Sequence, residues 1–145
     1  MTFCHQKFKH CFVACCASLL GQSSIADQEA IIAKLPVELQ KGKADEGVPN
    51  TSREVFSVVC GLGLTTNRYL LVSTGASYGG ITQFLKDNKT QAQKMMVFTK
   101  HPTNHCMRIK EIFDDKIVVM NPEEFDYTLM TWPVFEATQP TILLL

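Results

Sequence analysis

The pattern of hydrophobic and polar positions divides the chain into a helical first part and a strand-rich second part. The run Phe12 to Leu20 is apolar on nearly every side of a helix, which predicts a buried central helix. We expect this helix to begin near Cys11 and to stop before Gly21, because glycine is favoured just past a helix end.

Two capping-box spacings predict the next helices. Ser24-x-x-Asp27 opens a helix through about residue 34, and Thr51-x-x-Glu54 opens one that ends at residue 61 or 63. Residues 36–50 between them are polar and rich in turn formers, so we expect a surface loop there.

From residue 64 onward the pattern is typical of strands. The predicted strands span residues 64–72, 95–99, 105–113, 117–121, 127–130 and 141–145, with the last one paired inside the sheet. We expect a loop at 75–80, short helices at 81–86 and after the cap Thr131, and a hairpin turn at Asp114-Asp115. Helices followed by an antiparallel sheet predict an α+β fold, with the central helix packed on the sheet.

The length and charge of the chain narrow its class. With 145 residues, 46% of them hydrophobic and 19% charged, it is long enough for one globular domain, residues 1–145. Its formal net charge is zero, so nothing favours nucleic acid or an anionic membrane as a non-specific partner. No apolar run reaches the roughly 18 residues that a membrane span needs.

The cysteine pattern indicates reduced thiols. Cys15 and Cys16 are adjacent within an apolar run, where they cannot easily bridge each other, so we expect most cysteines to be small buried hydrophobes in a reducing, cytoplasmic setting. Secretion as an effector is the alternative. Lys7 and Lys9 before the apolar run resemble a signal peptide, but the run is short, and we expect the segment to be retained.

Cys11 is the candidate nucleophile. A thiol at a helix N-terminus lies at the positive end of the helix dipole, which lowers the pKa of the thiol and favours the thiolate. Such a thiol needs a base within hydrogen-bond reach. Among the histidines, His105 is the candidate, because it opens a strand that can hold its ring rigidly, whereas His5 and His10 lie on the segment leading into the helix.

Asn121 is the candidate to orient that base. It lies 16 residues after His105 on the opposite arm of the predicted hairpin. If the connection is three residues, or two residues plus a bulge, Met107 pairs with Asn121, and His105 and Asn121 become diagonal neighbours within about 7 Å. A two-residue loop without a bulge places them on opposite faces. Asn121 before Pro122 is also typical of a turn, and Asp126 is an alternative orienter.

Gln6 completes the candidate site. Its side-chain amide, together with the backbone N–H of Cys11, can stabilise the oxyanion of an acyl-transfer intermediate. The alternative is a solvated side chain on a mobile N-terminus.

These segments resemble a known family. Cys11-Phe-Val-Ala-Cys-Cys-Ala-Ser-Leu-Leu-Gly21 is similar to the nucleophile helix of the C39 and C39-like cysteine peptidases, in the papain-like superfamily, where Cys-Gly-Pro-Ala-Cys/Ser precedes an apolar run and Leu-Gly. The segment from His105 to Pro122 resembles the family's His strand, acidic turn and Asp/Asn-Pro strand, and the segment 127–145 resembles its closing helix and strand.

Three positions depart from that family's pattern. Phe12-Val13 replaces the usual Gly-Pro, and Gln6 is one residue closer to the nucleophile than the family's oxyanion glutamine. Asn121 stands where Asp is commoner, although papain itself uses Asn.

The resemblance implies a papain-like fold and a thiol hydrolase that acts on peptide or side-chain amide bonds with Cys11, His105, Asn121 and Gln6. It implies no metal or organic cofactor, and a peptide or protein substrate as the partner. Two alternatives stay open, an effector that deamidates or transfers acyl groups on a protein target, and an inactive peptide-binding domain. A metal-binding module is a third, with candidate ligands Cys4, His5, His10, Cys11, His105 and Cys106.

Overall fold

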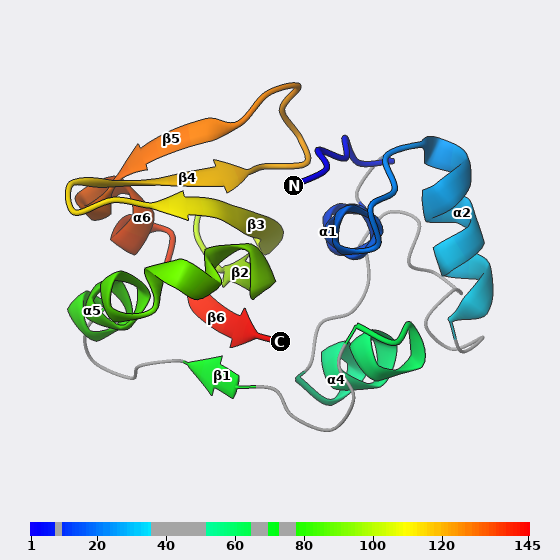
Figure 1. The fold of residues 1–145 in the computed structure, drawn as a ribbon, viewed down its shortest axis with the longest axis horizontal. Coiled ribbons are helices and arrows are strands. Elements are labelled where there is room, and N and C mark those ends of the chain that lie inside the picture. The colour runs from blue at the N-terminus through cyan, green and yellow to red at the C-terminus, as the bar shows by residue number, and fades with distance from the viewer. Residues whose placement is uncertain (8–9, 36–51, 65–69, 73–77) are drawn as a thin grey trace.

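The computed structural model describes residues 1–7, 10–35, 52–64, 70–72 and 78–145 (Figure 1). Its helices are α1 (Cys11–Leu19), α2 (Ile25–Lys34), α4 (Ser52–Gly61), α5 (Gly79–Asp87), the 3₁₀ helix η1 (Lys89–Lys94) and α6 (Trp132–Ala137). Its strands are β1 (Leu70–Val72), β2 (Met95–Thr99), β3 (His105–Ile112), β4 (Lys116–Met120), β5 (Thr128–Thr131) and β6 (Thr141–Leu144).

The strands form one antiparallel sheet in the order β1-β6-β2-β3-β4-β5. The last strand along the chain, β6, lies inside the sheet between β1 and β2, which confirms the prediction for the apolar terminal segment. β3, which begins at His105, is also an interior strand.

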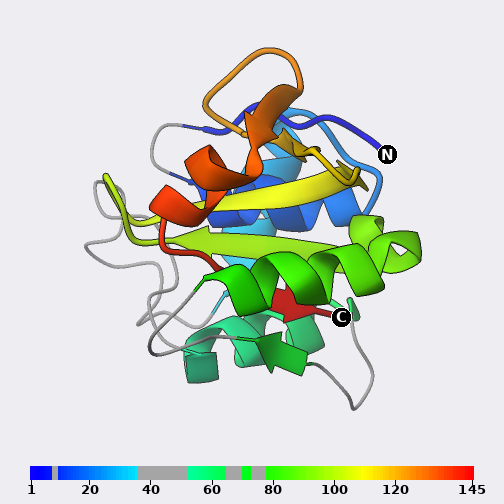
Figure 2. The ribbon, with the colours of Figure 1, turned by 90° about the vertical axis from the view of Figure 1, so that its left-hand side faces the viewer.

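Helices cover both faces of this sheet. α1, α2 and α4 lie on one side and α5 and α6 on the other (Figures 1 and 2). Two hydrophobic clusters match these layers, one joining α1 to Met96, Met120 and Leu143, the other joining Leu85 and Phe135 to the opposite face. The α+β prediction is therefore confirmed, with a central helix that is buried from Phe12 to Ser18.

Glycine ends two of the helices as predicted. Gly21 has φ 74°, and the backbone N–H of Gln22 donates to the Ala17 carbonyl, which is the Schellman arrangement at the end of α1. Gly63 has φ 72°, and the N–H of Leu64 donates to Val59 in the same way after α4. Both positions favour glycine because a left-handed backbone strains other residues.

The capping box before α2 is present. The Ser24 hydroxyl accepts the Asp27 N–H at 3.0 Å, and the Asp27 carboxylate accepts the Ser24 N–H at 3.0 Å. The second predicted box, at Thr51 and Glu54, lies outside the residues whose side chains are described. Thr131 does occupy the N-cap position of α6, but its side chain makes no capping hydrogen bond.

Several boundaries differ from the prediction. Leu64 is not in a strand, because its N–H closes the end of α4; residues 65–69 lie outside the described part, and only 70–72 form the strand. α5 begins at Gly79, so the predicted loop at 75–80 ends earlier, and its residues 75–77 lie outside the described part, as does the predicted loop 36–50. η1 was not predicted, since Lys89–Lys94 shows no apolar periodicity.

Candidate active site

Cys11 is the first residue of α1 and is partly exposed. The first N–H groups of an α-helix have no partner within the helix, and the side chain of the N-cap residue His10 makes no capping hydrogen bond to them. The backbone N–H of Cys106, the second residue of β3, donates to the Cys11 Sγ at 3.3 Å. The start of the central helix therefore meets the start of the interior strand, as the sequence predicted.

His105 and Asn121 are hydrogen-bonded across the hairpin. His105 Nε2 lies 2.6 Å from Asn121 Oδ1. The hairpin has a register shift between Ile109 and Glu111, and the N–H of Phe113 donates to Lys116, so the connection is a two-residue turn plus a bulge. This is one of the two geometries that we expected to bring the two side chains together.

The charge state of His105 follows from its surroundings. Its side chain is 11% exposed. Burial lowers the pKa of His105, but a hydrogen bond to Cys11 and the charge of Cys11, the Asn121 hydrogen bond and the charge of Glu123 together raise this pKa above 6.5. These contributions favour the imidazolium form of His105 next to Cys11.

Asn121 also builds the turn that follows β4. Its Oδ1 accepts the N–H of Glu123 at 3.1 Å, and its carbonyl accepts the N–H of Glu124 at 3.0 Å. Asn121 therefore forms the turn that the sequence indicates, and its Oδ1 also makes the hydrogen bond to His105 that the orienting hypothesis requires. The alternative orienter Asp126 instead accepts the N–H of Tyr127 at 2.7 Å.

Gln6 lies beside the same turn. Its backbone N–H donates to the carbonyl of Pro122 at 2.8 Å. The side-chain oxygen Oε1 is buried and has no hydrogen-bond partner among the described residues. The N-terminal segment is therefore fixed near Asn121 through its backbone.

The other thiols and histidines near the site lie in different surroundings from Cys11 and His105. Burial first, with smaller effects of Cys15 and Asp27, raises the pKa of Cys4 to about 11, and burial also raises the pKa of Cys16 and Cys106. These thiols stay neutral near pH 7 and pack in the core. Burial and Lys7 lower the pKa of His10. His5 instead contacts the carbonyl of Glu124 and stacks on Phe125.

The metal-binding alternative gains no support from this arrangement. Within the described ranges, no group of three or more His, Cys, Asp or Glu side chains is placed to hold a metal ion.

The sequence pattern did not identify two groups of the site, the backbone N–H of Cys106 and the carboxylate of Glu123. The backbone N–H of Cys106 carries no side-chain signal, so only the packing of α1 on β3 reveals it. Glu123 Oε1 lies 3.9 Å from His105 Nδ1 on an exposed side chain. Its position directly after an Asn-Pro pair, two residues beyond Asn121, was the available signal, because an Asn side chain commonly accepts the N–H two residues on.

Comparisons with known proteins leave the family open. No protein-family model matches the chain, and no curated protein matches it either. Among the helices of the described part, none is long and apolar enough to cross a membrane. Membership of the C39-like peptidases thus stays a prediction from the quoted motifs.

Proposed function

We propose that this chain is a thiol hydrolase of the C39-like, papain-like kind that cleaves peptide or side-chain amide bonds. The observation that carries the proposal is the placement of Cys11 Sγ 3.3 Å from the N–H of Cys106, the residue next to His105, with 2.6 Å between His105 Nε2 and Asn121 Oδ1. A nucleophile, a base and an orienting amide in hydrogen-bond sequence are what thiol-based acyl transfer needs.

The first half of the reaction uses the pair Cys11 and His105. The proton of Cys11 moves to His105, and the thiolate attacks the amide carbonyl carbon to form a C–S bond. The Cys106 N–H supports the thiolate before attack. The imidazolium then gives its proton to the leaving nitrogen as the C–N bond breaks, which leaves an acyl group on Cys11.

The second half uses water. His105 takes a proton from water, the hydroxide attacks the thioester, and Cys11 leaves as the thiolate. In both halves the negative charge on the former carbonyl oxygen needs donors, and the proposal assigns these to the Cys11 N–H and the Gln6 amide. Asn121 holds the ring throughout, since its oxygen accepts the Nε2 proton.

The same groups also support the catalytic alternative, an effector that deamidates or transfers acyl groups. Deamidation and acyl transfer to another amine begin with the same thioester, and differ in the amide attacked or in the group that replaces water. We propose hydrolysis because the resemblance to peptidases is the more specific indication. Incubation with a mixed peptide library distinguishes the reactions, since peptide hydrolysis gives new peptide termini, deamidation gives free ammonia, and acyl transfer gives amine adducts.

The decisive experiment measures the rate of iodoacetamide alkylation of Cys11 against pH, in a Cys60→Ser background that removes the other partly exposed thiol. We expect alkylation to persist at pH 6 and to fall at least about tenfold there in His105→Ala. His101→Ala, in the turn before β3, is the matched control and should react like the parent. An ordinary thiol profile with a midpoint near 8.5, unchanged by His105→Ala, contradicts the proposal and favours an inactive binding domain.

A further inference from the structure

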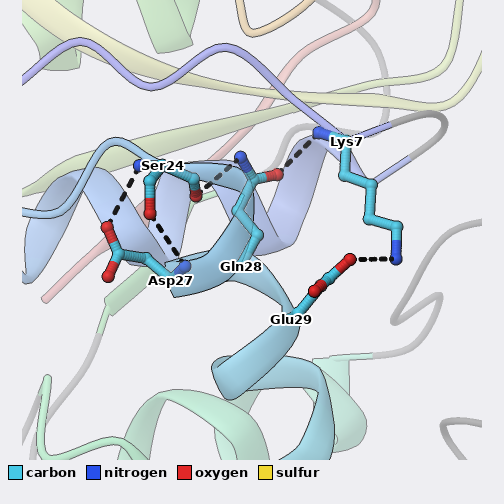
Figure 3. A network of polar contacts seen from close by, with 5 residues as sticks. All are labelled: Lys7, Ser24, Asp27, Gln28 and Glu29. Atoms are coloured by element: carbon cyan, nitrogen blue, oxygen red, sulfur yellow. Dashed lines mark hydrogen bonds and ion pairs between the residues drawn. The ribbon is translucent and has the colours of Figure 1, made fainter.

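Gln28 on α2 is a polar side chain with no exposed surface. Its amide is nevertheless fully bonded. Nε2 donates to the carbonyl of His5 at 2.8 Å, with Ser24 O and Cys4 Sγ each at 3.4 Å, and Oε1 accepts the N–H of Lys7 at 2.7 Å. Figure 3 shows this amide between the Lys7 nitrogen and the Ser24 carbonyl.

The two short hydrogen bonds of Gln28 go to His5 and Lys7, the residues on either side of Gln6. In an extended segment, the carbonyl of one residue and the N–H two residues later point to the same side, as in a strand pair, while the N–H between them points the opposite way. The Gln28 amide therefore acts as a neighbouring strand for residues 5 to 7 on one side. On the other side, the Gln6 N–H is bound by Pro122, next to Asn121.

The Gln6 side chain extends from a backbone that these hydrogen bonds clasp. Its Oε1 accepts no hydrogen bond from any residue that the structure describes, so no such bond fixes the direction of the side chain. The backbone of Gln6 is held from α2 and from the Asn121 turn at once. A buried amide costs free energy unless it is hydrogen-bonded. The burial of the Gln28 amide at a core position of α2 is therefore offset by its bonds to the backbone on either side of Gln6.

We propose that Gln28 is a positioning residue that sets Gln6 as the oxyanion donor by clasping the backbone of His5 and Lys7. This inference rests on the proposed thiol hydrolase. It assigns α2 a part in acyl transfer, although α2 contributes no group that touches the reacting atoms.

The test compares two reagents on the same Cys11. Acylation by p-nitrophenyl acetate passes through an oxyanion, whereas alkylation by iodoacetamide does not. Gln28→Met should therefore slow acylation about tenfold or more, with iodoacetamide alkylation unchanged. The loss should be absent when Gln28→Met is made in a Gln6→Ala background, because there is then no donor to position.

A second variant removes the backbone N–H that donates to Gln28 and leaves the Gln28 side chain unchanged. Lys7→Pro removes the N–H that Gln28 accepts and should slow acylation similarly. Lys7→Ala keeps that N–H and loses only the ion pair with Glu29, so it is the matched control. Ser24→Ala weakens the cap of α2 without touching the clasp and should acylate at the parent rate. If Gln28→Met does not fold, the two Lys7 variants decide.

The outcomes separate the two proposals. Normal acylation in Gln28→Met and Lys7→Pro, with His105-dependent alkylation intact, overturns the role of Gln28 and leaves the hydrolase standing. An equal loss in the Gln6→Ala background also overturns it, since the effect is then merely structural. Alkylation that does not depend on His105 in the parent protein overturns the hydrolase and this inference with it.

Discussion

At the scale of single residues, Asn121 shows what the sequence could predict. Its distance of 16 residues from His105 allowed the two side chains to meet only with a particular turn or bulge. Asp114-Asp115 indicated the turn, but nothing in the sequence specified the bulge between Ile109 and Glu111. A bulge is an extra unpaired residue, and hydrophobic alternation does not distinguish it from a longer loop. The sequence therefore predicts the pairing of His105 with Asn121 only if the hairpin has a three-residue connection, or two residues plus a bulge.

The first prediction concerns the titration of His105. Since the Asn121 hydrogen bond is one of the contributions that raise the pKa of His105, Asn121→Ala should lower this pKa from its value above 6.5. NMR of the imidazole carbon-bound protons against pH measures it. Asp126→Asn is the matched control, because Asp126 bonds to Tyr127, and should leave the pKa in place. An unchanged pKa in Asn121→Ala refutes the orienting role.

The same shift has a consequence for stability. A histidine whose pKa is raised on folding stabilises the fold while it is protonated, so the full contribution is present below pH 6.5 and is lost as pH rises through the folded pKa. Asn121→Ala should therefore lower the free energy of unfolding more at pH 6 than at pH 9, which urea unfolding at the two pH values measures.

At the scale of elements, Arg108 on β3 connects α1 and η1, which no sequence pattern links. It lies on β3 with 4% of its surface exposed, and its Nη1 donates to the Ser18 hydroxyl of α1 at 2.7 Å. Its Nη2 donates to the carbonyl of Gln93 in η1, and Ser18 in turn donates to the carbonyl of Thr2. A charged residue in an alternating strand predicts an exposed position, so this link emerges only from the packing of helix on sheet.

The second prediction follows from that link. Arg108→Ala should lower the free energy of unfolding by about 3 kcal/mol, because it leaves a cavity and removes a partner of the buried Ser18 hydroxyl and of the Gln93 carbonyl. Urea unfolding provides the measurement. Glu111→Ala, at an exposed position of the same strand, is the matched control and should change the stability by no more than about 0.5 kcal/mol. A loss below about 1 kcal/mol for Arg108→Ala would show that the link contributes little.

At the scale of the whole molecule, the order of the strands explains how the chain's two ends support one site. β6 is inserted between β1 and β2, and β2 pairs with β3, where Thr99 is opposite His105. The apolar segment Thr141–Leu144 predicted an interior strand without predicting its neighbours, because pairing partners depend on contacts far apart in sequence. The N-terminal segment contacts the β3–β4 hairpin at the end away from its turn, where the Gln6 N–H donates to the carbonyl of Pro122.

The third prediction tests that interior position by hydrogen exchange. Ile142 and Leu143 have 0% and 1% exposure and pair on both sides, so their amides should exchange only through near-global unfolding, as slowly as those of β2 and β3. Among the strands of the described part, β5 pairs with β4 alone and provides the comparison, since amides of an edge strand exchange through local opening. Residues this close to a chain end normally fray. Rapid exchange at Ile142 and Leu143 would therefore contradict the strand order, and with it the support that β6 gives, through β2, to the strand that holds His105.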